Sequence, residues 1–132
     1  MIHQLSVTNT NIYLDEIEIK GVLKDFPNIH QIKGIGVYRI SDVMFCNISG
    51  VLMVYIAQGK VQKMTFTSFN AIDIYDIPNT PREFITYKEK VLDYLSEKYR
   101  RRSDYEFFNR KYNFKVVTGD NDISILVGRR TI

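Results

Sequence analysis

Few residues of this chain have the types and the spacing that catalysis or metal binding requires. Its two histidines, His3 and His30, lie far apart in the sequence and form no paired-histidine metal motif on one helix. Gly34 and Gly36 lack both the third glycine and the following helix of a phosphate-binding loop. The sequence therefore predicts a protein that is not an enzyme and that holds no cofactor.

The lone cysteine and the acidic turn near the C-terminus are also poor candidates for chemistry. With Cys46 as the only cysteine, neither an intrachain disulfide nor a four-thiolate zinc site can form. Its place in an expected strand favours a small buried thiol over a nucleophile. Asp120 and Asp122 lack the closing glutamate of a calcium loop, so a hairpin turn explains them better. We expect no metal site and a reducing, cytoplasmic location.

The densest charge in the sequence is basic and lies in its C-terminal third. The cations, with one tyrosine among them, are Lys98, Tyr99, Arg100, Arg101, Arg102, Arg110, Lys111, Arg129 and Arg130. With Tyr105, Phe107 and Phe108 between them, they resemble a surface that contacts phosphates and stacks bases. Lys and Arg in the last turn of a helix also complement its dipole and then need no ligand. The net charge of only +3 favours this second interpretation, as do the nearby acids Glu97, Asp104 and Glu106.

Apolar periodicity predicts the elements that would position these residues. Residues 51–57 form an unbroken apolar run, which predicts an interior strand covered on both sides. After a turn at 58–60, Met64 and Phe66 lie two apart, as on one face of a second strand. Two shorter strands with a turn at Ser41-Asp42 precede this hairpin. Residues 112–118 and 123–127 predict another hairpin near the C-terminus.

Two helices are expected beside these strands. The spacing of Ile19, Val22, Leu23 and Phe26 places four apolar side chains on one helical face. Residues 80–83 read Thr-Pro-Arg-Glu, in which Thr80 fits an N-cap, so a helix is predicted from there to about residue 101. Residues 105–108 suggest one further helical turn.

The fold class that follows is α+β, an antiparallel meander sheet with two main helices packed on one face. We expect a single domain over residues 1–132, because this length buries a sufficient core without disulfides. Its segments at about 10–68 and 80–130 could be two degenerate halves, each a helix followed by strands. No apolar run approaches the length of a membrane span.

Residues 69–78 carry more apolar side chains than an exposed connection normally does. They include Phe69, Ile72 and Tyr75. The segment is expected either to pack over a sheet edge, where it adds a strand, or to form an exposed binding loop.

The order of elements over residues 14–66 resembles the repeat of small outer-membrane-assembly lipoproteins and of β-lactamase inhibitory proteins. The residues concerned are a helix ending in Phe26-Pro27, a strand containing Tyr38, and a strand pair turned at residues 59–61. The signal and the lipidated cysteine of those lipoproteins are not seen here, so their location is not implied. What the resemblance implies is an α+β module that binds proteins without catalysis.

We therefore predict first a non-enzymatic cytoplasmic module that binds another protein, as an inhibitor or an immunity-type protein does against a toxin or effector. Interface cores are enriched in Tyr, Phe and Arg. The candidate contact residues are Phe69, Ile72, Tyr75, Tyr99, Arg101, Arg102 and Tyr105. The alternative is a nucleic-acid-binding regulator that uses residues Lys98 to Arg102, and a small-molecule enzyme comes third. No membrane partner is expected.

Overall fold

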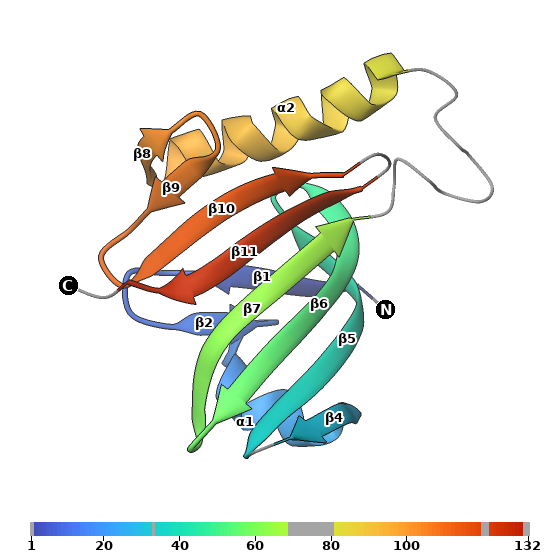
Figure 1. Ribbon diagram of the computed structural model, residues 1–132, viewed down its shortest axis with the longest axis vertical. Coiled ribbons are helices and arrows are strands. Elements are labelled where there is room, and N and C mark those ends of the chain that lie inside the picture. The colour runs from blue at the N-terminus through green and yellow to red at the C-terminus, as the bar shows by residue number, and fades with distance from the viewer. Residues whose placement is uncertain (1, 33, 69–80, 120–121, 131–132) are drawn as a thin grey trace.

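Strands make up most of the structure, and one long helix, α2, lies against them (Figure 1). This computed structural model describes residues 2–32, 34–68, 81–119 and 122–130. The strands are β1 (His3–Val7), β2 (Ile12–Leu14), β3 (Ile17–Glu18), β4 (Asn28–Ile32), β5 (Ile35–Phe45), β6 (Ile48–Ala57), β7 (Lys60–Ser68), β8 (Arg100–Ser103), β9 (Glu106–Phe108), β10 (Tyr112–Thr118) and β11 (Ile123–Arg129). The helices are α1 (Ile19–Val22), the 3₁₀ turn η1 (Leu23–Asp25) and α2 (Pro81–Lys98).

All eleven strands of the described residues belong to one sheet. Ten follow the order β3-β2-β1-β5-β6-β7-β11-β10-β9-β8, and β4 pairs with β5 outside this path. β1 runs parallel to β5, whereas the other pairings among described strands are antiparallel. The sheet is therefore mixed and strongly curved (Figure 1).

The predicted fold class, an α+β meander with two main helices, is wrong. The first predicted helix shrinks to the four residues of α1, followed by one 3₁₀ turn. Asp15 and Glu16 adopt left-handed backbone angles, with φ of 54° and 70°, and turn the chain from β2 into β3. A helix cannot continue through such residues. The apolar spacing was sound, since Ile19 and Leu23 are buried, but the backbone before them forms strands.

The turns predicted near residues 41–50 differ from those in the structure. Ser41-Asp42 does not end a strand but forms a bulge within β5, where Asp42 has a φ of 59°. The true turn between β5 and β6 is Cys46-Asn47, with φ of 55° and 65°, the signs that a tight two-residue hairpin requires. Cys46 is buried there, as predicted, and burial raises the pKa of its thiol. The further helical turn predicted at residues 105–108 is wrong, because residue 105 ends the turn between β8 and β9 and residues 106–108 are β9 itself.

The predicted central hairpin is confirmed as β6 and β7. Leu52 pairs with Phe66 and Val54 with Met64, and all four side chains are buried on the inner face of the sheet. The alternate residues of β6, including Met53, are only half-buried on the outer face. The unbroken apolar run is thus an interior strand within its sheet, but the side chains of its outer face are only half-buried and are not covered by a described helix or strand. The C-terminal hairpin of β10 and β11 is also as predicted.

Helix α2 covers part of the inner face. Val91 and Leu95 are fully buried in the same core as β1, β2 and the central strands. The ring of Tyr94 lies edge-on to Phe45 at 5.9 Å between centroids. The helix begins at Pro81, as predicted, and ends at Lys98, before the predicted end near residue 101. Its predicted N-cap, Thr80, lies outside the described residues.

Substitution within the apolar stripe of α2 tests this packing. We expect Leu95→Ala to lower the free energy of unfolding by about 2–5 kcal/mol, because the fully buried side chain leaves a cavity. Leu92→Ala is the matched control, and it should cost clearly less because Leu92 is only partly buried. Urea denaturation followed by circular dichroism measures both. Equal losses for the two variants would contradict the orientation of the helix.

Candidate functional site

Two turns that are distant in the sequence meet at one end of the molecule. Residues 8–11 connect β1 to β2, and residues 109–112 lead from β9 into β10 (Figure 1). The Asn109 Nδ2 donates to the Thr8 carbonyl at 3.0 Å, and the backbone N–H of Arg110 donates to Asn9 Oδ1 at 3.1 Å. We name this contact, residues 8–11 with residues 109–112, the seam. Its hydrogen bonds join the β1–β2 turn to the β9–β10 turn, although β1 and β10 are far apart in the strand order.

Asn109 is the most fully engaged side chain of the seam. Only 9% of its surface is exposed. While its Nδ2 donates across the seam, its Oδ1 accepts from the backbone N–H groups of Lys111, at 3.0 Å, and Tyr112, at 2.8 Å. A buried amide with both ends hydrogen-bonded fixes its own orientation and that of the turns it joins.

Tyr99, a predicted partner contact, instead belongs to the structural support of the seam. Its hydroxyl donates to the Val7 carbonyl at 2.9 Å, and its ring stacks on Phe114 with 4.1 Å between centroids. Burial, with smaller contributions from Tyr94 and Cys46, raises the pKa of the Tyr99 hydroxyl. Tyr99 therefore fixes the end of α2 to β1 and offers little surface to a partner.

On one side of the seam lies an open hollow of about 590 Å³. Its cations are Lys98, Arg100, Arg110 and Arg130, and Glu97 is the one acid among its described lining residues. We name it the arginine hollow. A smaller hollow of about 310 Å³ adjoins it and shares Asn9, Lys98, Tyr99 and Asn109 with it. Together they form a polar, basic depression beside the seam.

A second basic hollow, of about 150 Å³, lies on the other side of the seam. Its cations are Lys20, Lys60, Lys111 and Arg129, and Glu18 is its one described acid. We name it the lysine hollow. Residues adjacent in the sequence line different hollows. Arg110 lines the arginine hollow and Lys111 the lysine hollow, and Arg130 and Arg129 are divided in the same way.

The charge gathered around the seam is large for a chain with a net charge of +3. The two hollows contain eight of the 18 Lys and Arg residues but only two of the 15 Asp and Glu residues. None of these eight cations forms an ion pair with a described residue. Like charges held together without counter-charges produce a positive field that attracts anions.

The helix-dipole explanation of the basic run applies only to Lys98. Helix α2 ends there, and Arg100, Arg101 and Arg102 belong to the strand β8. Of the three acids predicted to neutralise part of the patch, Glu97 lines the arginine hollow, but neither it nor Asp104 or Glu106 forms an ion pair with a described arginine. β8 is an outer strand of the sheet, and its charges also discourage pairing with another chain.

The other predicted contact residues differ in what they offer. Arg101 is turned onto its own chain, since its Nε donates to the Ser103 carbonyl at 3.1 Å and its Nη2 to the Asp104 carbonyl at 2.9 Å. Arg102 is exposed and lies over the ring of Phe108. Tyr105 is 40% exposed, with the Lys88 ammonium 4.9 Å from its ring centroid. Phe69, Ile72 and Tyr75 lie outside the described residues.

Sequence reasoning missed two of the eight cations, Lys20 and Lys60. They come from α1 and from the first residue of β7, and no local pattern connects them with residues 98–130. Asn9 and Asn109 were missed as well. A polar turn residue carries no sign of its partner, so only the fold reveals the seam.

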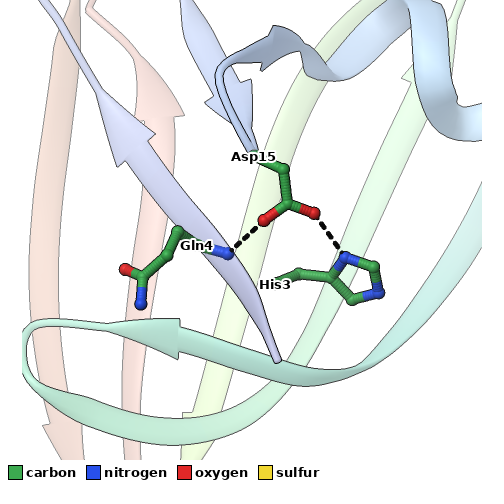
Figure 2. Close-up of polar contacts among 3 residues, drawn as sticks. All are labelled: His3, Gln4 and Asp15. Atoms are coloured by element: carbon green, nitrogen blue, oxygen red, sulfur yellow. Dashed lines mark hydrogen bonds and ion pairs between the residues drawn. The ribbon is translucent and has the colours of Figure 1, made fainter. Parts of the chain in front are cut away.

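His3 and Asp15 form a second polar cluster, shown in Figure 2. The His3 Nδ1 donates to Asp15 Oδ2 at 2.6 Å, and the Gln4 backbone N–H donates to Asp15 Oδ1 at 2.8 Å. The Gln4 hydrogen bond, and after it the one from His3, lowers the pKa of the Asp15 carboxyl. The other side of the cluster is apolar, because the His3 ring lies edge-on to Phe26. Both carboxylate oxygens are used to fix β1 to the β2–β3 turn, which is a structural task.

The described residues contain no group of three or more His, Cys, Asp and Glu that could hold a metal ion. None of their helices has the length and apolarity needed to cross a membrane. Comparison of the chain with protein-family models, curated proteins and solved structures found no match. The geometry of the seam and its two hollows is therefore the basis for assigning a function.

Removal of the Asn109 side chain tests the seam. We expect Asn109→Ala to lower the free energy of unfolding by about 2–4 kcal/mol, because three hydrogen bonds of a nearly buried amide are lost at roughly 1 kcal/mol each. Asn113→Ala is the matched control. Its Oδ1 is buried without a hydrogen-bond partner among the described residues, so its removal should cost little. Denaturation curves that shift equally for both variants would show that the Asn109 hydrogen bonds do not stabilise the fold.

Proposed function

We propose that the protein is a non-enzymatic module that binds the phosphate backbone of a nucleic acid strand in the arginine hollow. The observation that carries this proposal is the set of cations beside the seam that lack ion pairs. Arg100, Arg110 and Arg130 come from three separate segments, and the fold brings them to one concave surface. A basic groove that follows a backbone is the common feature of proteins that bind single strands.

The composition of the hollow supports a nucleic acid over an acidic protein surface. Protein interfaces are depleted of charged residues at their centres and enriched in apolar and aromatic ones. Interfaces with nucleic acid are more polar and much more positively charged. Here the described lining consists mainly of Lys, Arg and Asn, and the half-buried Phe108 is its most apolar side chain.

Binding of another protein, as an inhibitor or an immunity-type protein, is the second candidate. One observation favours it: Val117 and Leu126, at 41% and 39% exposure, lie on the outer face of β10 and β11. Exposed apolar side chains on a sheet face can contribute to an interface. The proposal is weaker, because Tyr99 is partly buried and packs against the core, and residues 69–78 lie outside the described part.

The test of the proposed function is the salt dependence of binding to a mixed-sequence single-stranded oligonucleotide, measured by fluorescence anisotropy. Arg100→Ala combined with Arg110→Ala should weaken binding for every sequence. It should also reduce the slope of log K against log salt by about 1.4, which corresponds to two lost phosphate contacts on a single strand.

The matched control is Lys63→Ala combined with Lys115→Ala, which removes two exposed cations from the outer face of the sheet. This variant should keep its slope nearly unchanged. If the wild-type protein fails to bind oligonucleotides at physiological salt, the proposed function is wrong. If both double variants lose affinity equally, net charge and not the hollow governs binding.

A further inference from the structure

Two guanidinium groups share one aromatic ring at the edge of the arginine hollow. The Arg130 guanidinium lies 4.5 Å from the centroid of the Phe108 ring, and the Arg102 guanidinium lies 4.9 Å from the same centroid. Arg102 belongs to β8, whereas Arg130 directly follows β11. Phe108 and Arg130 also line the hollow. The fold thus brings two arginines from distant segments onto one ring.

Both guanidinium groups are held in place before any ligand arrives. Stacking on an aromatic face restricts a guanidinium while leaving the N–H groups at its edge available. Arg130 is restricted further, because its Nη1 donates to the Asn109 carbonyl at 3.2 Å. Each guanidinium carries five donors in a planar fork, so most of them stay available to an anion. A preorganised pair of this kind lowers the entropy lost on binding.

The pair also lacks a counter-charge. Neither Arg102 nor Arg130 forms an ion pair with a described residue. Both guanidinium groups lie within 4.9 Å of the Phe108 centroid, so two uncompensated positive charges flank one ring. A phosphate monoester carries a charge of about −1.5 to −2 at neutral pH, whereas a phosphodiester within a strand carries only one negative charge. Planar, bidentate contacts from arginine suit the oxygens of a phosphate particularly well. Charge and geometry together match a monoester better than a diester.

We infer that Arg102, Phe108 and Arg130 form a binding site for a terminal phosphate monoester. This inference rests on the proposed function: the terminal phosphate belongs to a strand whose following nucleotides occupy the arginine hollow. Arg102 and Arg130 contact the phosphate, and Phe108 is a positioning residue that orients them. A 5′ and a 3′ phosphate have the same chemistry at this site, and the experiment distinguishes between them.

The test compares three oligonucleotides of one sequence, which carry no terminal phosphate, a 5′ phosphate or a 3′ phosphate. We expect one of the two phosphorylated forms to bind at least about tenfold more tightly than the unphosphorylated form, because new hydrogen bonds form between charged groups. Phenyl phosphate, a small monoester, should compete away this preference and leave binding of the unphosphorylated strand largely intact.

Charge-conserving variants locate the site. Arg102→Lys combined with Arg130→Lys keeps both charges but removes the planar forks, so the preference should fall to about twofold or less. Phe108→Leu keeps both arginines and should reduce the preference through loss of their orientation. Arg39→Lys, an exposed arginine of β5, is the matched control and should keep the full preference. Because Phe108 and Arg130 also line the arginine hollow, affinity for the unphosphorylated strand can fall as well, and the preference is taken as the ratio of the two affinities for each variant. A circular dichroism spectrum and a thermal unfolding curve like those of the wild-type protein show that each variant is folded.

The possible outcomes separate this inference from the proposed function. Equal affinity of the wild-type protein for all three oligonucleotides overturns the terminal-phosphate site and leaves backbone binding in place. A preference that survives both Arg→Lys substitutions also overturns it, because the phosphate is then recognised elsewhere. If no oligonucleotide binds but a phosphorylated peptide does, the inference as stated and the proposed function are both wrong.

Discussion

The hydrogen bond that Asn109 donates across the seam, together with the two that it accepts within its own turn, is the constraint on which the rest of this structure depends. A curved sheet whose outer strands do not pair leaves its two ends to be joined by other means. Here the side-chain amide of Asn109 donates a hydrogen bond to the Thr8 carbonyl and accepts hydrogen bonds from two backbone N–H groups of its own turn. Hydrogen bonds within a nearly buried site are strengthened by the low local dielectric, and loss of a partner there is costly. The seam therefore sets how closely β1–β2 approaches β9–β10.

The basic character of this end of the molecule follows from the seam. Arg110 and Lys111 come directly after Asn109. Fixing the asparagine therefore also fixes these two cations, one in each hollow on either side of the seam. Arg130 is tied to the same turn, since its backbone N–H donates to the Lys111 carbonyl at 2.7 Å. Cations gathered in this way repel one another and destabilise the fold slightly. A ligand with negative charge removes that repulsion, which links the stability of the seam to the binding proposed for its hollows.

Local patterns in the sequence predicted the hairpins and the long helix correctly. Leu52, Val54, Met64 and Phe66 alternate as strands do, and the Pro81 start of α2 was evident from helix-start chemistry. The first helix is shorter than predicted because left-handed angles at Asp15 and Glu16 form the turn between β2 and β3, and only residues 19–25 are helical.

Most cations of the candidate site could be predicted from the sequence, but their arrangement could not. The run at residues 98–102 was visible as charge, but its division between the end of α2 and the strand β8 was not. The curvature of the sheet, and not the order of the residues, brings Lys20, Lys60 and Arg130 to the seam beside which this run lies. Contacts between segments so distant in the sequence leave no periodic signal.

The most direct measurement of the central claim is a ¹⁵N-edited NMR titration of the protein with a short single-stranded oligonucleotide. The account predicts that the backbone amides of Asn9, Arg100 and Arg110, which surround the arginine hollow, shift together with one common dissociation constant. Amides on the outer face of the sheet, such as those of Met53 and Leu126, should not move. Shifts centred on that outer face, or no shifts at all at physiological salt, would contradict the account.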